Sequence, residues 1–515
     1  MTLDNSENTK RIAKNTMMLY IRMMFSMLVS LYTSRVILAA LGVEDYGIYN
    51  VVGGFVAMFS LFSTSLSASV SRYLTFELGK QDKKQLRLVF TTSLFIHLLL
   101  GLVILILAEI VGVWFLNTHL TIPESRLYAA NWVFQASLIS FVFALLGVSF
   151  NASIISHEKM GAFAAIGIGD VTLRLLIVLF IGYASFEVDR LILYSILMTL
   201  VVIVVQLAYY FYCKIKFEEC SLNFTYDKKC LKEMSSFAGW NFIGCSAGLL
   251  KEQGVNILLN IFIGPVLNAA RGLAGSVNSA ITSFAWNFMA ALNPQITKNY
   301  ALSNYSYTFS LVERGSKFSF YILFILALPV LLETDFILTL WLKNYPEHTV
   351  NFIRLILILS LCDIISNTLI TLQLATGKIR NYQIAVGGTL LMNFPLSWLC
   401  LYLGYPPEST LVVAIFISLC CLFLRLFFLN RMVGLCIRHY LKEVCFNAIK
   451  VAILSSVVPI IMRITIDEGW ISFLSVCIVS VISTGVVIYF FGCTLTERDF
   501  LKAKATSFLQ RSKVI

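Results

Sequence analysis

The sequence predicts an all-α integral membrane protein with about fourteen transmembrane helices, and three observations point to this class. The 515-residue chain is 58% hydrophobic and only 13% charged, whereas a soluble domain carries roughly a quarter charged residues. Its mean hydropathy is +0.82. Apolar runs recur along the chain without the alternation of barrel strands, so they are expected to cross a bilayer as helices, which satisfy their own backbone hydrogen bonds.

The helices are placed wherever about twenty apolar residues run between charged residues, Pro or Gly. Six spans are expected at residues 17–40, 48–71, 90–114, 128–150, 161–183 and 191–213. Six more follow a polar segment, at 236–262, 267–292, 317–342, 351–374, 382–403 and 409–430. A last pair is expected at 445–465 and 470–492. Ser, Asn and Gly make the spans at 48–71 and 267–292 the least apolar of these.

These spans divide the chain into five parts. They are a cytoplasmic N-terminal segment (1–16), an N-lobe of six helices (17–213), a cytoplasmic linker (214–235), a C-lobe of six helices (236–430) and a C-terminal part with two helices and a cytoplasmic tail (431–515). The distribution of basic residues supports this number of spans. Alternate loops hold most of the Lys and Arg residues, and the loops on the other side of the membrane hold only Arg126, Arg190 and Lys343. A miscounted helix would scramble this alternation, so both termini are expected on the cytoplasmic side of a bacterial inner membrane.

Several classes of function are disfavoured. Basic loops that meet anionic membrane lipids explain the net charge of +11, so no nucleic-acid partner is expected. The twelve Cys are scattered and the five His show no HExxH pattern, so neither a disulfide framework nor a metal site is expected. The sequence contains no Walker A motif and no nucleophile elbow. We therefore expect no cofactor, no ATP-driven pump and no enzyme.

Polar residues inside the spans are informative, because a charge at bilayer depth costs at least ~2.5–3.5 kcal/mol and is usually paired or faces water. They include Lys251, Glu252, Asn256 and Asn260 in the seventh span, and Arg271, Asn278 and Thr282 in the eighth. Spacings of four and seven residues place most of each set on one helix face. Two such helices can line a hydrophilic cavity, although the same residues could simply hydrogen-bond neighbouring helices.

Charges in other spans are also candidates. The first span contributes Arg22 and Arg35 as further cations. Asp363 lies mid-span without a local partner, which makes it a possible site of proton or cation exchange. Asp170 is another possible coupling group, but Arg174 lies four residues later and can neutralise it on the same helix.

Four short segments carry a family resemblance. They are LGVEDYGIYN at 41–50, SRYLTFELGK at 71–80, GPVLNAARG at 264–272 and ALNPQITK at 291–298. In their order and spacing they resemble segments of polysaccharide (O-antigen type) flippases, which belong to the multidrug/oligosaccharidyl-lipid/polysaccharide exporter (MOP) superfamily. The resemblance covers essentially the whole chain, including the six–six–two arrangement of spans.

The resemblance implies two six-helix lobes around a central cavity that opens alternately to each membrane face. It implies a flippase that moves undecaprenyl-pyrophosphate-linked oligosaccharide across the inner membrane for O-antigen, lipopolysaccharide or other surface polysaccharide biosynthesis. Arg35, Lys251 and Arg271 are this sequence's candidates for the charge that binds the pyrophosphate, and Glu252 is a candidate for ion exchange. The expected partners are the lipid-linked oligosaccharide, a polysaccharide polymerase and a chain-length regulator.

Three alternatives stay open. A cation-coupled multidrug exporter of the same superfamily would have twelve spans and an acidic N-lobe site, where the chief acid here is Asp170. A lipid II flippase shares fourteen spans, but its Arg-rich first-loop motif is not matched at 43–46. A membrane-embedded glycan polymerase or ligase usually keeps its catalytic residues in a large periplasmic loop, and the outside loops here are short.

Overall fold

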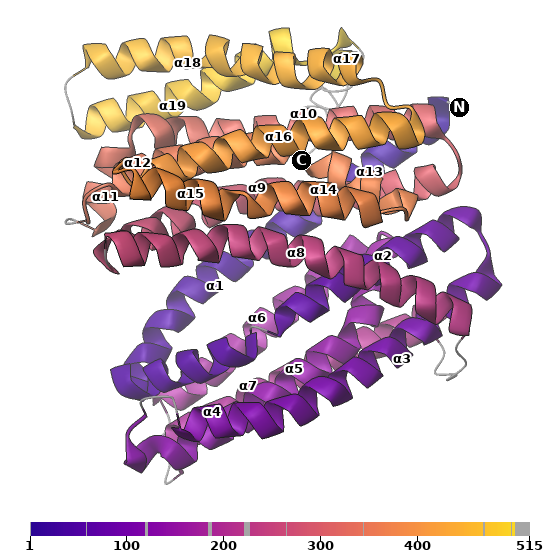
Figure 1. Cartoon of the computed structure of the whole chain (residues 1–515), viewed down its shortest axis with the longest axis vertical. Coiled ribbons are helices and arrows are strands. Elements are labelled where there is room, and N and C mark those ends of the chain that lie inside the picture. Colours follow the sequence, from indigo (N-terminus) through magenta and orange to yellow (C-terminus); the bar gives the residue numbers. More distant parts are fainter. Residues whose placement is uncertain are drawn as a thin grey trace, which may run out of the picture. The chain divides into compact units, whose positions relative to one another are not determined.

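The computed structural model describes residues 2–57, 59–118, 122–183, 188–220, 227–263, 265–342, 345–466, 469–495 and 497–499. Every element in these ranges is a helix (Figure 1), so the predicted all-α class is confirmed. Ten helical stretches of the described chain are long and apolar enough to cross a membrane. The other four predicted spans coincide with parts of α1 (Thr2–Ala57), α2 (Ser60–Lys80), α8 (Lys228–Phe262) and α9 (Pro265–Ala301). The protein is therefore a multi-pass membrane protein of about fourteen spans.

The helices of the first half begin and end at identifiable residues. After α1 and α2 come α3 (Lys83–Leu107), α4 (Val113–Thr118), α5 (Leu127–Ser156), α6 (Met160–Tyr183) and α7 (Arg190–Lys216). Helix α1 kinks at Gly42, whose φ of 80° is favourable only for glycine, and this kink separates the first two predicted spans. Asp82 and Asp189 cap α3 and α7 by accepting backbone N–H groups of the first turn.

Some predicted spans of the second half are divided between two helices. After α8 and α9, the helices of this half are α10 (Tyr305–Leu332), α11 (Thr334–Leu342), α12 (Thr349–Ile365), α13 (Asn367–Thr376), α14 (Arg380–Leu391), α15 (Asn393–Tyr402), α16 (Ser409–Val433), α17 (Ile437–Tyr440), α18 (Asn447–Thr465) and α19 (Trp470–Val487). The predicted span 382–403 breaks at Met392 between α14 and α15. Pro395 then lies in the first turn of α15, where its missing N–H breaks no hydrogen bond within that helix.

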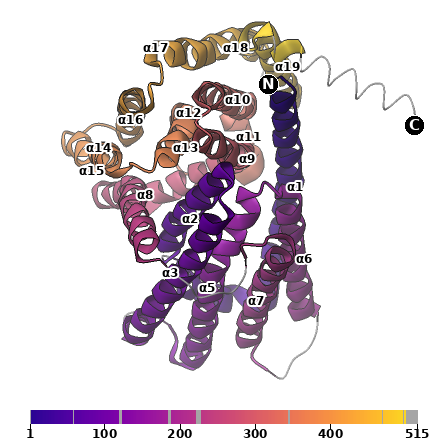
Figure 2. The same cartoon turned by 90° about the vertical axis from the view of Figure 1, so that its right-hand side faces the viewer.

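The described chain forms two compact units, and unit 1 comprises residues 1–246, 290–305 and 374–383. Within it α1 packs on α6, and α5 packs on both α2 and α7. Helices α2, α3 and α5 lie side by side in Figure 2. Their shared core includes Phe90 and Phe150, whose rings meet edge to face at 5.4 Å between centroids. This packing fixes the helices that carry the polar residues of unit 1.

A buried arginine of unit 1 holds the turn between α13 and α14. The guanidinium of Arg72 on α2 lies 4.4 Å from the ring centroid of Tyr73 and donates a hydrogen bond of 3.2 Å to the carbonyl of Ala375. Gly377 follows that carbonyl with φ at +74°. A Cβ on Gly377 would lie 2.5 Å from Arg72 Nη2, so both the backbone conformation and the close approach require glycine there.

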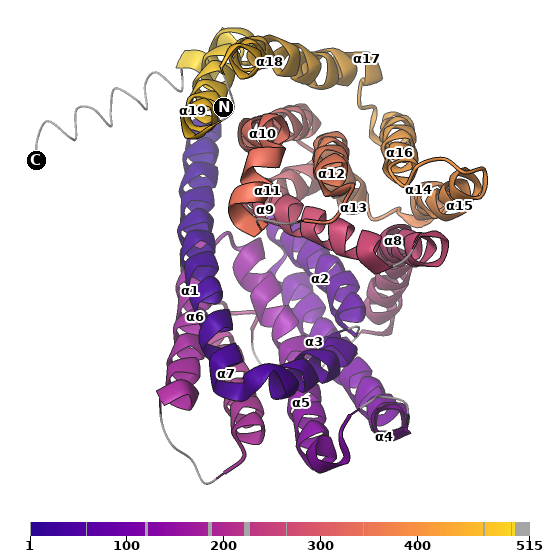
Figure 3. The same ribbon diagram turned by 90° about the vertical axis from the view of Figure 1, so that its left-hand side faces the viewer.

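Unit 2 comprises residues 247–289, 306–373 and 384–515. Within it α16 packs on α12 and α15, and α18 packs along α19, as Figure 3 shows. The hairpin of α18 and α19 is joined to the rest of unit 2 by two buried ion pairs. Lys317 Nζ lies 2.7 Å from Glu497 Oε2, and Arg463 Nε lies 3.2 Å from Glu333 Oε1. Both carboxylate side chains are nearly inaccessible, so their charges depend on these partners.

Glu408 is the centre of a polar cluster just before α16. Its Oε1 lies 2.7 Å from His348 Nδ1 and accepts a hydrogen bond of 3.0 Å from Asn351. Partial burial pushes the pKa of Glu408 up, but the hydrogen bonds from Asn351 and His348 outweigh it and hold that pKa below its usual range.

The division of the chain into lobes at 214–235 and 431 stays a prediction.

Candidate functional site

A polar cavity of ≈ 410 Å³ lies within unit 2. Its polar lining residues are Lys251 and Asn256 from α8, Arg271, Asn278 and Ser279 from α9, Ser360 and Asp363 from α12, Asn393 from α15, and Thr410 from α16. On α9 the lining recurs at 271, 275, 278 and 279, which is the spacing of one helix face. The sequence thus directs one polar face of α9 into this cavity.

The only ion pair among the described lining residues joins Lys251 to Asp363. Lys251 Nζ lies 3.8 Å from Asp363 Oδ2, which is longer than an N–H···O hydrogen bond. The lysine side chain is 10% exposed and the aspartate side chain is 47% exposed. Asp363 also accepts a hydrogen bond from the hydroxyl of Ser418 on α16. The carboxylate is therefore held between α8 and α16, and the ammonium keeps donors that a ligand can use.

Hydrogen bonds between helices fix the other sides of the cavity. Ser360 on α12 donates to Asn278 Oδ1 on α9 at 2.8 Å. Asn393 on α15 donates from Nδ2 to the backbone carbonyl of Lys251 on α8 at 3.3 Å. These two hydrogen bonds join α12 to α9 and α15 to α8 through polar side chains, as is common between membrane helices.

The charge of the lining favours an anionic ligand. Among the residues that the structure describes, the lining carries two cations, Lys251 and Arg271, and one carboxylate, Asp363. The remaining polar groups are amides and hydroxyls, which donate and accept hydrogen bonds without adding charge. Such a set can bind phosphate oxygens and sugar hydroxyls together. No group of His, Cys, Asp or Glu in the described part of the chain could hold a metal ion.

The structure brings five predicted site residues into this one cavity. They are Lys251, Asn256, Arg271, Asn278 and Asp363. Two further predicted residues, Arg35 on α1 and Glu252 on α8, have side chains outside the described set. Asp363 on α12 has no partner on its own helix, and it forms its ion pair with Lys251 on α8.

The two other predicted residues lie in unit 1. The guanidinium of Arg22 on α1 lies 4.3 Å from the ring centroid of Phe163 on α6, where it joins two helices. Asp170 accepts a hydrogen bond of 2.8 Å from Arg174 Nε on the same helix. Arg174 in turn lines a second cavity of ≈ 450 Å³ with Ser140 and Thr199. The cation of that cavity is already paired with an acid of its own helix.

Sequence reasoning missed the supporting residues of the unit 2 cavity. Ser360, Asn393 and Thr410 line it, and Ser418 hydrogen-bonds Asp363. Each is a single polar residue in an apolar run, which is also the pattern of residues that only join helices. The one available signal is the pair Asn393 and Pro395, because an amide beside a helix break often satisfies freed backbone groups.

Comparison with known proteins identifies the fold. No family model matches the sequence, and no curated protein matches it. A MATE protein in the bent conformation matches with a TM-score of 0.70 at 14% identity, covering 82% of this chain and 96% of that chain. The MATE transporter ClbM in complex with Rb+ matches with a TM-score of 0.65 at 14% identity, covering 83% and 96%. An outward-facing multidrug resistance MATE family transporter of the MOP superfamily matches with a TM-score of 0.68 at 14% identity, covering 82% and 95%.

The chain therefore has the fold of MATE transporters. One of these structures is described as a member of the MOP superfamily, which is the superfamily that the four sequence segments resemble. The match takes in nearly all of each MATE chain but leaves a part of this chain unmatched. This chain is thus longer than the fold that it shares.

Proposed function

We propose that the protein is a flippase that moves undecaprenyl-pyrophosphate-linked oligosaccharide units across the bacterial inner membrane by alternating access. The observation that carries the proposal is the pair of cations, Lys251 and Arg271, in a cavity whose other polar lining residues are amides, hydroxyls and the single carboxylate of Asp363. A pyrophosphate offers the anionic oxygens that these cations bind, and the attached sugars offer hydroxyls for the neutral groups. The lipid tail stays in the bilayer while the head group passes.

Each cavity residue has a distinct role in this proposal. Arg271 holds two phosphate oxygens in the bidentate manner of a guanidinium, and Lys251 adds a point charge. Asp363 competes with the substrate for Lys251, so binding of an anion weakens the 3.8 Å ion pair. The freed carboxylate then takes up a proton or cation. Arg35 and Glu252 stay predicted members of the same pathway, and Asp170 a predicted coupling group.

The setting of the flippase is part of the proposal. We expect both termini in the cytoplasm, because the basic loops then lie on the cytoplasmic side. The product, a lipid-linked unit on the outer face, requires a polymerase and a chain-length regulator to become surface polysaccharide. We therefore expect those two proteins as functional partners and expect no catalysis by this chain.

A cation-coupled multidrug exporter is the second candidate. The shared fold favours it, because one matching structure is a multidrug resistance MATE family transporter and another is in complex with Rb+. Two features favour the flippase instead. Cationic drugs would be repelled by Lys251 and Arg271, and the chain extends beyond the MATE fold, as a protein with two more helices would.

The test follows radiolabelled lipid-linked oligosaccharide on each side of the inner membrane in a deletion strain. Lys251→Ala and Arg271→Ala are compared with wild type at matched protein levels. Each lost charge-assisted contact is worth about 1.5–3 kcal/mol, so we expect roughly 10- to 150-fold weaker substrate binding. The labelled unit should accumulate on the cytoplasmic face.

Arg354→Ala is the matched control, because Arg354 lies on α12, pairs with Asp335 at 3.0 Å and does not line the cavity. It should flip the substrate normally. Normal translocation in both cavity variants, with changed sensitivity to amphipathic cations, would move the protein to drug export. Units that cross but stay unpolymerised in the deletion strain would point to a polymerase or ligase.

A further inference from the structure

A second cavity of unit 1 is a large groove that shares no lining residue with the cavity of Arg174. Its volume is ≈ 1280 Å³, and three chain segments line it. These are the turn from α2 into α3 (77–88), the turn between α5 and α6 (His157 and Lys159), and the end of α7 with its following turn (216–219). The sequence predicts that all three segments face the cytoplasm.

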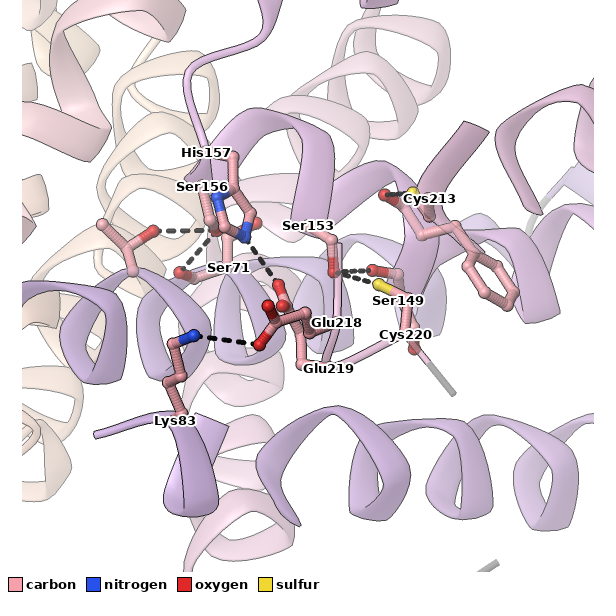
Figure 4. Close-up of polar contacts among 12 residues, drawn as sticks. Ser71, Lys83, Ser149, Ser153, Ser156, His157, Cys213, Glu218, Glu219 and Cys220 are labelled. Atoms are coloured by element: carbon pink, nitrogen blue, oxygen red, sulfur yellow. Dashed lines mark hydrogen bonds and ion pairs between the residues drawn. The ribbon is translucent and has the colours of Figure 1, made fainter. Parts of the chain in front are cut away.

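Two of the four acidic residues that line this groove, Glu218 and Glu219, each contact a basic side chain, as Figure 4 shows. Lys83 Nζ lies 2.9 Å from Glu218 Oε2. His157 Nε2 lies 2.6 Å from Glu219 Oε1. The imidazole stacks on Phe217 at 4.0 Å between centroids. The bond to Lys83 lowers the pKa of Glu218, so that carboxylate is ionised at neutral pH and stays with its partner. These two contacts join the start of α3 and the α5–α6 turn to the segment that follows α7.

Four cations of the groove are left over. Lys84 and Arg87 lie in the first turns of α3, Lys159 follows the end of α5, and Lys216 ends α7. All four are exposed. None of them forms an ion pair with any residue in the described ranges. Glu77 and Asp82 also line the groove, so four cations from three separate segments stand against two further carboxylates, and the excess charge of the groove is positive.

The groove lies at the ends of helices that can span a membrane. Helices α3 and α7 are apolar enough to cross the membrane, and the four cations lie at their ends or at the adjacent turn. Ile215, the residue before Lys216, is 76% exposed, so an apolar side chain is accessible beside the cations. Leu78 and Leu88 add apolar surface to the lining. A ligand here meets positive charge and hydrocarbon together.

We propose that this groove binds the phosphate head group of an anionic phospholipid. Positive charge complements the phosphate, and apolar lining beside it suits the glycerol and the upper acyl chains. The bound lipid bridges the α2–α3 turn, the α5–α6 turn and the end of α7. It thereby stabilises unit 1 at the cytoplasmic face, independently of any transported substrate.

The test measures the thermal unfolding midpoint of the purified full chain in neutral detergent during titration with phosphatidylglycerol or with phosphatidylcholine of the same acyl chains. Phosphatidylglycerol should raise the midpoint at concentrations at which phosphatidylcholine does not. Each surface cation contributes about fivefold to binding of an anionic lipid. Lys84→Gln/Arg87→Gln should therefore weaken apparent affinity on the order of twentyfold, and Lys159→Gln/Lys216→Gln similarly.

Lys228→Gln/Lys232→Gln is the matched control, since it removes the same charge from exposed residues of α8 that do not line the groove. It should bind phosphatidylglycerol as wild type does. An equal loss of affinity in this control would overturn the proposal in favour of diffuse surface attraction. Equal responses to both lipids would overturn it as well. If inorganic phosphate at equal concentration displaces phosphatidylglycerol, the ligand is a soluble phosphate compound and the assignment to a lipid is wrong.

Discussion

Replacing Asp363 by Asn is expected to destabilise the protein more than replacing Lys251 by Met, although each change breaks the same ion pair. The two side chains differ in exposure, at 47% for Asp363 and 10% for Lys251. Asp363→Asn leaves a buried ammonium without its counter-charge. Lys251→Met leaves a carboxylate that still reaches solvent and still accepts the hydrogen bond from Ser418. The asymmetry therefore follows from burial and not from the pair itself.

The distance between the two charges and their exposure set the expected loss of stability. Two unit charges 3.8 Å apart attract by about 4 kcal/mol at an effective dielectric constant near 20. Solvent at the half-exposed carboxylate reduces the net coupling to about 1–2 kcal/mol. Removing the partner of a buried charge costs about 3–5 kcal/mol. We therefore expect a loss of about 3 kcal/mol for Asp363→Asn and about 1 kcal/mol for Lys251→Met.

Equilibrium unfolding of the purified variants in mixed micelles measures these differences. Asp335→Asn is the control, because its ion pair with Arg354 is largely exposed and should be worth at most about 1 kcal/mol. Inorganic pyrophosphate should stabilise Asp363→Asn more than wild type, since it supplies the missing anion. The reasoning is refuted if Lys251→Met proves the more destabilising change, or if pyrophosphate stabilises both proteins equally.

Three further changes test other parts of the structure. Gly377→Ala should lower the thermal unfolding midpoint by the equivalent of about 1–3 kcal/mol, because its Cβ meets Arg72 at 2.5 Å; an unchanged midpoint would contradict the contact. Glu497→Gln leaves buried Lys317 with a neutral partner, so limited proteolysis should release the C-terminal segment faster than in wild type. Glu408→Gln should destabilise the protein at pH 7, and this destabilisation should shrink as the pH is lowered. The pKa of Glu408 is lowered in the folded state, so its stabilisation is present above the unfolded pKa of about 4.3 and is lost as the pH falls. Unfolding midpoints across that range measure the difference.

The positions of the spans could be predicted because each depends on local sequence. A run of apolar residues is the same signal wherever the helix packs, so the predicted 161–183 and 470–492 coincide closely with α6 and with α19 and its final turn. Breaks within spans were missed. The interruption at Met392 follows from Pro395 in the next helix, and a proline in a helix interior and one in a first turn look alike in sequence.

The site was predictable only in part. Helical spacing placed Arg271 and Asn278 on one face, because both lie on the same helix. No spacing rule could place Asp363 near Lys251, since that distance depends on how α8 and α12 pack. The guanidinium of Arg22 lies over the ring of Phe163 on another helix, a contact that no spacing rule could predict either. Its role as a cavity cation stays a prediction.

The ion pair between Lys317 and Glu497 has a consequence for biosynthesis. The two residues are 180 positions apart, and ribosomes add about 5–20 residues per second. Lys317 therefore enters the membrane on the order of 10–40 s before its counter-charge exists. During that interval the nascent chain carries Lys317 without this partner, and Glu313, one turn earlier on α10, is the nearby acid that is already present. A contact formed late in translation thus completes the packing of α10 within unit 2.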